Sequence, residues 1–175
     1  MEIHQWDACF ISDAFFEKIN DPFLKQNKTG TARPHFLAIK SERPALIWVV
    51  PMSSKIDKYQ KIIDKRMEAK KPCDSIKIFK IGGIKEAILF QDMFPVLPHY
   101  ISDLYRHDGN VYSVKNPFVK KELDAAAQKV SDLLSRGVRF TPTQPDIPRI
   151  KEIMQREINQ MEATNTKEIR EYDCI

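Results

Sequence analysis

The sequence predicts an α+β protein with a compact, strongly twisted antiparallel β-sheet or β-barrel core decorated by helices. Short apolar runs separated by turn residues occupy the first part of the chain, which is typical of an antiparallel meander. Two stripes of apolar residues at helical spacing follow in the second part. A meander of about five or six short strands commonly closes into a barrel or packs against helices. We therefore expect two C-terminal amphipathic helices to cover the sheet.

The first part of the chain carries strand, turn and cap signals in a regular order. From the N-terminus we expect a strand, a short helix capped by Ser12 and Asp13, a polar loop, and a hairpin of two strands joined by a tight turn. The expected strand covers residues 5–12, the short helix residues 12–19 and the polar loop residues 20–32. The two hairpin strands cover residues 36–39 and 45–50, and the turn between them covers residues 41–44.

The later elements have equally local signals. Gly82 and Gly83 predict a tight turn between strands. Asn116 and Pro117 are typical of a helix start, and Gly137 is typical of a helix end. The expected elements are a helix over residues 56–70, strands over 75–81, 84–90 and 93–96, and helices over 116–137 and 146–161.

Composition indicates an ordinary globular protein. Of 175 residues, 42% are hydrophobic and 30% are charged, so the chain can bury a core and is not expected to be disordered. We expect one domain over residues 1–163 and a polar tail over residues 164–175. Cys9, Cys73 and Cys174 lack the spacing of a zinc site or a redox pair. Because no signal peptide or membrane span is recognisable, we expect a cytoplasmic protein with reduced thiols and no membrane partner.

The candidate site is organised around residues 45–56. The apolar run before Pro51 predicts a buried strand, and proline lacks an N–H, so we expect the chain to leave the sheet there. Ser53 or Ser54 is then the expected N-cap of the next helix. With Lys55 beside them, these hydroxyls and the helix N-terminus form a turn suited to a phosphate group. The alternative is a simple capped helix with a solvated lysine.

The predicted hairpin brings two further side chains to this turn. Arg33 and His35 precede one strand, and Pro51 follows the other, so an antiparallel pairing puts them at the same end of the sheet. His35 is a candidate for moving a proton, because an imidazole titrates near neutral pH. The alternative is a structural imidazole beside a strand.

Basic residues gather directly after the serines. Residues 55–80 contain nine basic and four acidic side chains, a local excess of +5 in a chain of formal charge +4. Lysines on one face of the predicted helix either position phosphates or form a solvated face. Tyr59 and Phe79 either stack on bases or pack in the core. The candidate RNA-binding residues are Lys58, Tyr59, Lys61, Lys65, Arg66, Lys77 and Lys80.

The sequence lacks the motifs of several classes of enzyme. There is no glycine-rich phosphate loop, no His/Glu helical metal pair and no carboxylate cluster, so we expect no metal and no cofactor. Cations, hydroxyls and imidazoles suit the cutting of RNA by attack of its own 2′-hydroxyl on the adjacent phosphate. The protein then aligns the attack, moves protons and stabilises the added negative charge.

The chain resembles the toxins of type III toxin–antitoxin systems, the ToxN/AbiQ group and in particular its CptN-like branch. The resemblance covers about Ala8 to Gly137. It rests on the strand and helix over residues 8–20, on Arg33-Pro34-His35-Phe36, on Val50-Pro51-Met52-Ser53-Ser54-Lys55, and on Met93-Phe94-Pro95-Val96.

This resemblance implies a metal-independent, sequence-selective endoribonuclease with a barrel similar to MazF/Kid toxins, an SH3-like barrel, and a role in phage abortive infection. It implies products with 2′,3′-cyclic phosphate and 5′-hydroxyl ends. It also implies a partner, a repetitive antitoxin RNA whose units, folded as pseudoknots, the enzyme cuts and which then inhibit it in a closed assembly. The resemblance further implies cellular RNA as a substrate, and no DNA is expected.

The family's active-site residues fall on Ser53, Ser54 and Lys55, with Arg33 or His35 as the basic residue before the second strand. In the expected ToxN-like pattern one residue separates the hydroxyl pair from the lysine, which leaves Lys55 and Lys58 as alternatives. Two other functions stay open from the residues alone: a non-catalytic RNA- or DNA-binding barrel, and a toxin acting on a protein target.

Overall fold

The computed structural model describes residues 2–27, 32–40 and 46–172, with side chains as far as residue 164. The strands are β1 (Ala8–Ile11), β2 (Pro34–Lys40), β3 (Ile47–Ser53), β4 (Lys77–Ile81), β5 (Ile84–Ile88), β6 (Phe94–Val96), β7 (Ile101–Leu104), β8 (Arg106–His107) and β9 (Asn110–Val111). The helices are α1 (Asp13–Ile19), α2 (Ile56–Glu68), α3 (Pro117–Ser135) and α4 (Ile147–Tyr172), with 3₁₀ turns η1 (Phe90–Asp92) and η2 (Pro98–Tyr100).

The core of the protein is a seven-stranded antiparallel sheet. Its order is β4-β5-β3-β2-β1-β7, with β6 also beside β3, and β8 and β9 form a separate hairpin. Within the described ranges the strand pairings run as an open path from β4 to β7. The expected α+β class with an antiparallel core is confirmed, whereas the expected turn over residues 41–44 lies outside the described residues.

Strand β3 has a different partner at each of its ends. One edge pairs with β2 along most of its length. The other edge pairs with β6 over Ile47–Val49 and with β5 at Met52 and Ser53. The middle of the sheet therefore depends on this one strand.

The expected departure of the chain from the sheet at Pro51 is wrong. The strand continues to Ser53, and Pro51 is paired with His35 of β2. On its other edge Pro51 lies between Val49, the last residue paired with β6, and Met52, the first paired with β5. Its missing N–H therefore falls where the partner strand changes, and its carbonyl still accepts a hydrogen bond from the Leu89 N–H at 3.0 Å.

The expected serine cap of α2 is also wrong. The residue that caps this helix is Lys55, and no side chain caps the helix by a hydrogen bond. The Ser53 hydroxyl instead accepts the Lys55 N–H at 3.3 Å, in a short turn between strand and helix. Because the strand is longer than expected, both serines precede the helix and their hydroxyls are not used by its first turn.

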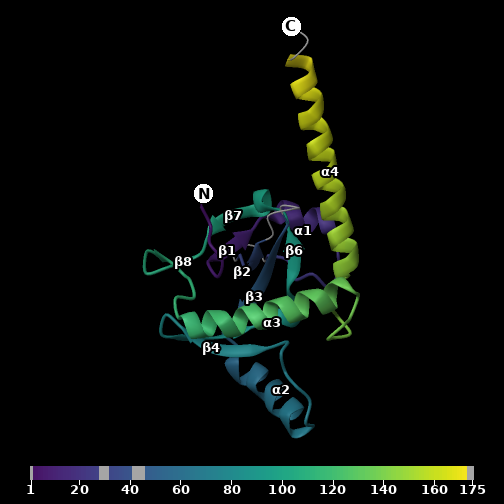
Figure 1. Ribbon diagram of the computed structural model, residues 1–175. Coiled ribbons are helices and arrows are strands. Elements are labelled where there is room, and N and C mark those ends of the chain that lie inside the picture. Colours follow the sequence, from purple (N-terminus) through teal and green to yellow (C-terminus); the bar gives the residue numbers. More distant parts are fainter. Residues whose placement is uncertain (1, 28–31, 41–45, 173–175) are drawn as a thin grey trace.

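Helices α3 and α4 cover the sheet, as the apolar stripes predict (Figure 1). Helix α3 packs against β2 and η1, and α4 packs against β6. The Asn116 side chain caps α3, because its Oδ1 accepts the Phe118 N–H at 2.9 Å. Helix α4 is longer than predicted: it continues to Tyr172 and extends away from the rest of the molecule (Figure 1). The division into a domain and a tail stays a prediction.

A second, small core attaches α2 to the sheet. It consists of Tyr59, Ile76, Ala87 and Leu89, separate from the main core beneath α3 and α4. Arg66 of α2 adds a polar contact, because its Nη1 donates to the Ser75 hydroxyl at 2.9 Å. This packing holds the helix beside β4 and β5 (Figure 1).

We predict that Asp124 is the polar contact that fixes α3 on the sheet. The buried Trp6 indole donates to the Asp124 carboxylate at 2.7 Å, and the Gln5 side chain donates to the same oxygen at 2.9 Å. Asp124→Ala leaves the indole N–H unpaired, so the free energy of unfolding should fall by about 1–3 kcal/mol. Asp124→Asn retains an acceptor and should cost less. Equal losses for both variants, measured by urea denaturation, would contradict this assignment.

Candidate active site

A groove of about 440 Å³ opens where β2 begins and β3 ends. It contains four of the five residues that the sequence predicts as catalytic: Arg33, Ser53, Ser54 and Lys55. Gln26, Ala32, Pro34, Met52, Glu86 and Tyr105 complete its lining. The sheet thus brings together side chains from two segments about twenty residues apart.

The register between β2 and β3 positions the two halves of the groove. His35 is paired with Pro51, and continuing this register places Arg33 opposite Ser53. The Asn27 Oδ1 accepts the Arg33 N–H at 3.1 Å. The Asn27 amide in turn donates to the Ile11 carbonyl at 2.9 Å, which links Arg33 through Asn27 to β1.

The groove suits a bound anion. Ser53 is half-buried, Ser54 and Lys55 are exposed, and their hydroxyls and ammonium lie on one short turn. Within the described ranges neither Lys55 nor Arg33 has a carboxylate partner within ion-pair distance. Two cations without partners beside two hydroxyls form a site that favours a phosphate group.

Glu86 and Tyr105 belong to the groove but were not predicted from the sequence. Glu86 precedes Ala87, which is paired with Ser53, so the β3–β5 pairing brings this carboxyl to the site. Glu86 is half-buried, and burial raises the pKa of its carboxyl above the ordinary value. Tyr105 packs edge-on against Phe10, with ring centroids 5.6 Å apart. Both residues reach the groove through contacts between segments distant in the chain, which the sequence alone does not show.

His35 is not brought to the groove. Its side chain is 1% exposed, packs edge-on against Phe94, and its Nδ1 has no hydrogen-bond partner. Burial, together with the nearby Arg33 charge, lowers the pKa of His35 to about 3, so the imidazole is neutral at physiological pH. The hairpin brings His35 to the expected end of the sheet, but its side chain is buried and does not line the groove, which fits the alternative of a structural imidazole.

The candidate RNA-binding residues divide into three groups. Lys58, Lys61 and Lys65 are exposed on α2 and do not line the groove, so their role in binding stays a prediction. Tyr59 is buried in the small core, which favours the core-packing alternative over stacking on bases.

Of the remaining three, Arg66 lies on α2, and Lys77 and Lys80 lie on β4. Arg66 is engaged with Ser75, and Lys77 forms an ion pair with Asp74 at 3.6 Å. Lys80 is exposed and lines a different cavity. The expected basic surface is therefore interrupted by structural contacts.

Two further surveys cover only the described ranges. In these ranges no three His, Cys, Asp or Glu side chains are grouped so that they could hold a metal ion. Likewise, none of the described helices combines the length and apolar character that a membrane crossing requires.

Comparison with known proteins gives a match in structure and none in sequence. No protein-family model matches the chain, and no curated protein matches it. Among solved structures, AbiQ, a lactococcal anti-phage endoribonuclease belonging to the type III toxin–antitoxin system, is similar with a TM-score of 0.65. The likeness covers 85% of this chain and 95% of that chain at 9% sequence identity. The chain therefore shares the AbiQ fold, which confirms the expected resemblance at the level of the fold.

We predict that His35 makes folding pH-dependent. Below about pH 6.5 the unfolded chain binds a proton on this imidazole, whereas the folded chain does so only near pH 3. The free energy of unfolding should therefore fall as the pH drops through this window, by up to about 1.4 kcal/mol per pH unit from this residue. Urea denaturation of His35→Leu should lack this component. Parallel pH profiles for the two proteins would contradict the prediction.

Proposed function

We propose that this chain is an endoribonuclease toxin of a type III toxin–antitoxin system, and that it cuts RNA at the groove between β2 and β3. The observation that carries the proposal is the meeting of Arg33, Ser53, Ser54 and Lys55 in one groove. The fold shared with AbiQ, itself an anti-phage endoribonuclease, supports the same function.

In this mechanism the scissile phosphate binds at the turn after β3. The Ser53 and Ser54 hydroxyls donate hydrogen bonds to its oxygens. Lys55 and Arg33 stabilise the negative charge that develops as the phosphorus becomes five-coordinate, and the planar guanidinium can contact two oxygens at once. Because these cations have no carboxylate partner in the described ranges, no ion pair must break before the phosphate binds. The reaction proposed here uses no metal ion and no cofactor.

Glu86 is the proposed general base. Its carboxylate takes the proton from the 2′-hydroxyl, whose oxygen then attacks the adjacent phosphorus. The bond from phosphorus to the 5′-oxygen breaks, which leaves a 2′,3′-cyclic phosphate and a 5′-oxygen that takes a proton from solvent. A carboxyl whose pKa is raised by burial is a stronger base than an ordinary glutamate.

The proposed partner is a repetitive antitoxin RNA. By this proposal the enzyme cuts the repeat RNA into folded units, pseudoknots, and is then inhibited by them in a closed protein–RNA assembly, as well as cutting cellular RNA when free. The exposed lysines Lys58, Lys61 and Lys65 of α2 adjoin the groove in sequence and support RNA binding there. The enzyme would act in the cytoplasm, during abortive infection by phage.

We predict that Lys55, and not Lys58, serves the reaction. Lys55 lines the groove, whereas the Lys58 ammonium lies over the Tyr59 ring, 5.3 Å from its centroid. The wild-type protein should cut RNA in the presence of a chelator and leave cyclic phosphate ends. Lys55→Ala should lower kcat by about 10²-fold or more, since it removes a charge that stabilises the transition state.

Lys58→Ala is the matched control, because it removes the same charge one helical turn away, and it should keep kcat within about twofold. Equal loss of cleavage in both variants would contradict the assignment of Lys55. A wild-type protein that binds RNA but never cuts it would overturn the proposed activity.

We predict that Glu86 sets the acid limb of the pH–rate profile. The general base must be deprotonated to work, so kcat should increase with pH as Glu86 loses its proton. Because burial raises the pKa of Glu86, the midpoint of this increase should lie above the pKa of an ordinary glutamate. Arg33, Lys55 and Tyr105 line the same groove as this carboxyl. Glu86→Gln should lower kcat by roughly 10²–10⁴-fold and remove that limb. An unchanged acid limb in the variant would exclude Glu86 as the base.

A further inference from the structure

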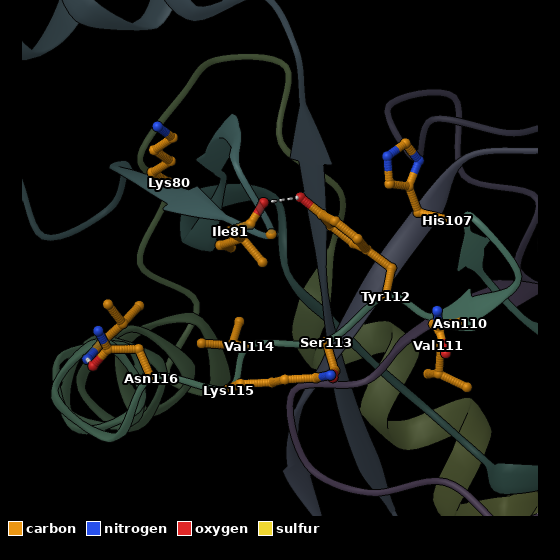
Figure 2. A pocket seen from close by; sticks show the side chains of 12 residues that line it. Lys80, Ile81, His107, Asn110, Val111, Tyr112, Ser113, Val114, Lys115 and Asn116 are labelled. Atoms are coloured by element: carbon orange, nitrogen blue, oxygen red, sulfur yellow. Dashed lines mark hydrogen bonds between the residues drawn. The ribbon is translucent and has the colours of Figure 1, made fainter.

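A second cavity of about 350 Å³ lies beside the groove, among elements that the proposed cleavage does not use. Its walls come from the β4–β5 turn, the β8–β9 hairpin and the segment that leads into α3. Figure 2 shows the side chains that surround it, including Lys80, His107, Asn110, Tyr112 and Lys115. Its volume lies within the range of about 300–1,000 Å³ that is common for ligand sites.

The cavity is lined by cations, amides and apolar side chains, with no carboxylate. Lys80 and Lys115 are exposed, and neither has an ion-pair partner in the part of the chain that the structure describes. Lys85 is paired with Lys80 across the β4–β5 hairpin and adds to the positive charge. The Asp108 side chain is 89% exposed, and its carboxylate lies 3.5 Å from the His107 ring.

The asparagine side chains of the cavity can also form hydrogen bonds with an uncharged part of a ligand. The Asn110 amide nitrogen donates to the Asp108 carbonyl at 3.2 Å, which leaves its oxygen free to accept. The Asn116 oxygen accepts the Phe118 N–H, which leaves its NH₂ free to donate. Ile81, Val111 and Val114 supply the apolar lining between them. An apolar surface with one free donor and one free acceptor suits the face and edge of a nucleobase.

Tyr112 makes the cavity a fixed feature. Its hydroxyl donates to the Ile81 carbonyl at 3.0 Å, as the dashed line in Figure 2 marks. Its ring stacks on Phe36 of the main core, with centroids 5.9 Å apart. A Cβ at Gly82, where φ is +56°, would lie 3.4 Å from the same ring, so the turn approaches Tyr112 closely.

The cavity and the groove are neighbours. Tyr105 lines the groove, Tyr112 lines the cavity, and their ring centroids are 5.5 Å apart. The Glu86 carboxylate of the groove is close enough to Tyr112 that its charge, after burial, helps to raise the pKa of that tyrosine to about 12. The pair of tyrosine rings therefore connects the groove to the cavity.

We propose that this cavity is a nucleotide subsite that binds a nucleotide flanking the scissile phosphate in single-stranded RNA. Its base lies against the apolar lining and contacts the two asparagine amides, and the adjoining phosphates lie at Lys80 and Lys115. The inference rests on the proposed function, because it names where the substrate of that same groove continues.

The test uses a short single-stranded 2′-O-methyl RNA of random sequence, which has no 2′-hydroxyl to attack and so binds without being cut. The double variant Lys80→Ala/Lys115→Ala should bind it about tenfold more weakly at low salt. Removing two phosphate contacts should also make the plot of the logarithm of the association constant against the logarithm of the salt concentration shallower by about 1.4. Lys40→Ala, an exposed lysine at the far end of β2, is the control and should bind as the wild type does.

A second measurement locates the bound nucleobase. RNA carrying a photoreactive thiouridine should crosslink to the segment 107–116 of the wild type, and the double variant should lose this crosslink. Unchanged affinity and salt slope in the double variant, or crosslinks that never reach this segment, would overturn the subsite. If the subsite results hold but ordinary RNA is never cut, the proposed activity fails and the binding site stands.

Discussion

The division of one edge of β3 between two partner strands is the constraint on which the rest of the structure depends. The buried apolar residues of β3 belong to the main core, and the small core beneath α2 begins at Ala87, the β5 residue that is paired with Ser53. Pro51 occupies the change of partner, where a missing N–H costs no ladder hydrogen bond. Beyond it the last paired residue is Ser53, so the turn with Lys55 projects from a strand held on both edges. A rigid strand end of this kind is a good place for a site that must align a phosphate.

Several local signals in the sequence were informative, although the expected serine cap of α2 was not. The Asn116 cap, the Gly82-Gly83 turn and the hairpin that joins Arg33 to Ser53 all depend on residues close in the chain, and the structure contains each of them. The end of β3 was misjudged because Pro51 was considered without its partners. The burial of Tyr59 and His35 was ambiguous because exposure depends on what packs against a face. Glu86 and Tyr105 stayed hidden because only the pairing of distant strands brings them to the groove.

The cations that could contact RNA are spaced along the groove and the cavity and do not form one continuous basic patch. The sequence places its excess of positive charge in residues 55–80, yet Arg66 and Lys77 in this segment are occupied by structural contacts. Arg33 and Lys55 in the groove, and Lys80 and Lys115 in the cavity, have no ion-pair partner in the described ranges. Two tyrosine rings in contact separate these pairs. A polyanionic strand that crosses this face meets cations at intervals, with aromatic surface between them.

The most direct test of this account is a crystal structure of the protein with an uncleavable 2′-O-methyl RNA. The account predicts a phosphate in the groove, within hydrogen-bond distance of the Ser53 or Ser54 hydroxyl and of Lys55 or Arg33, with Glu86 facing the 2′-oxygen. RNA that binds along α2 or elsewhere and leaves the groove without a phosphate would contradict it. In that case the turn after β3 would be only the connection between a strand and a helix.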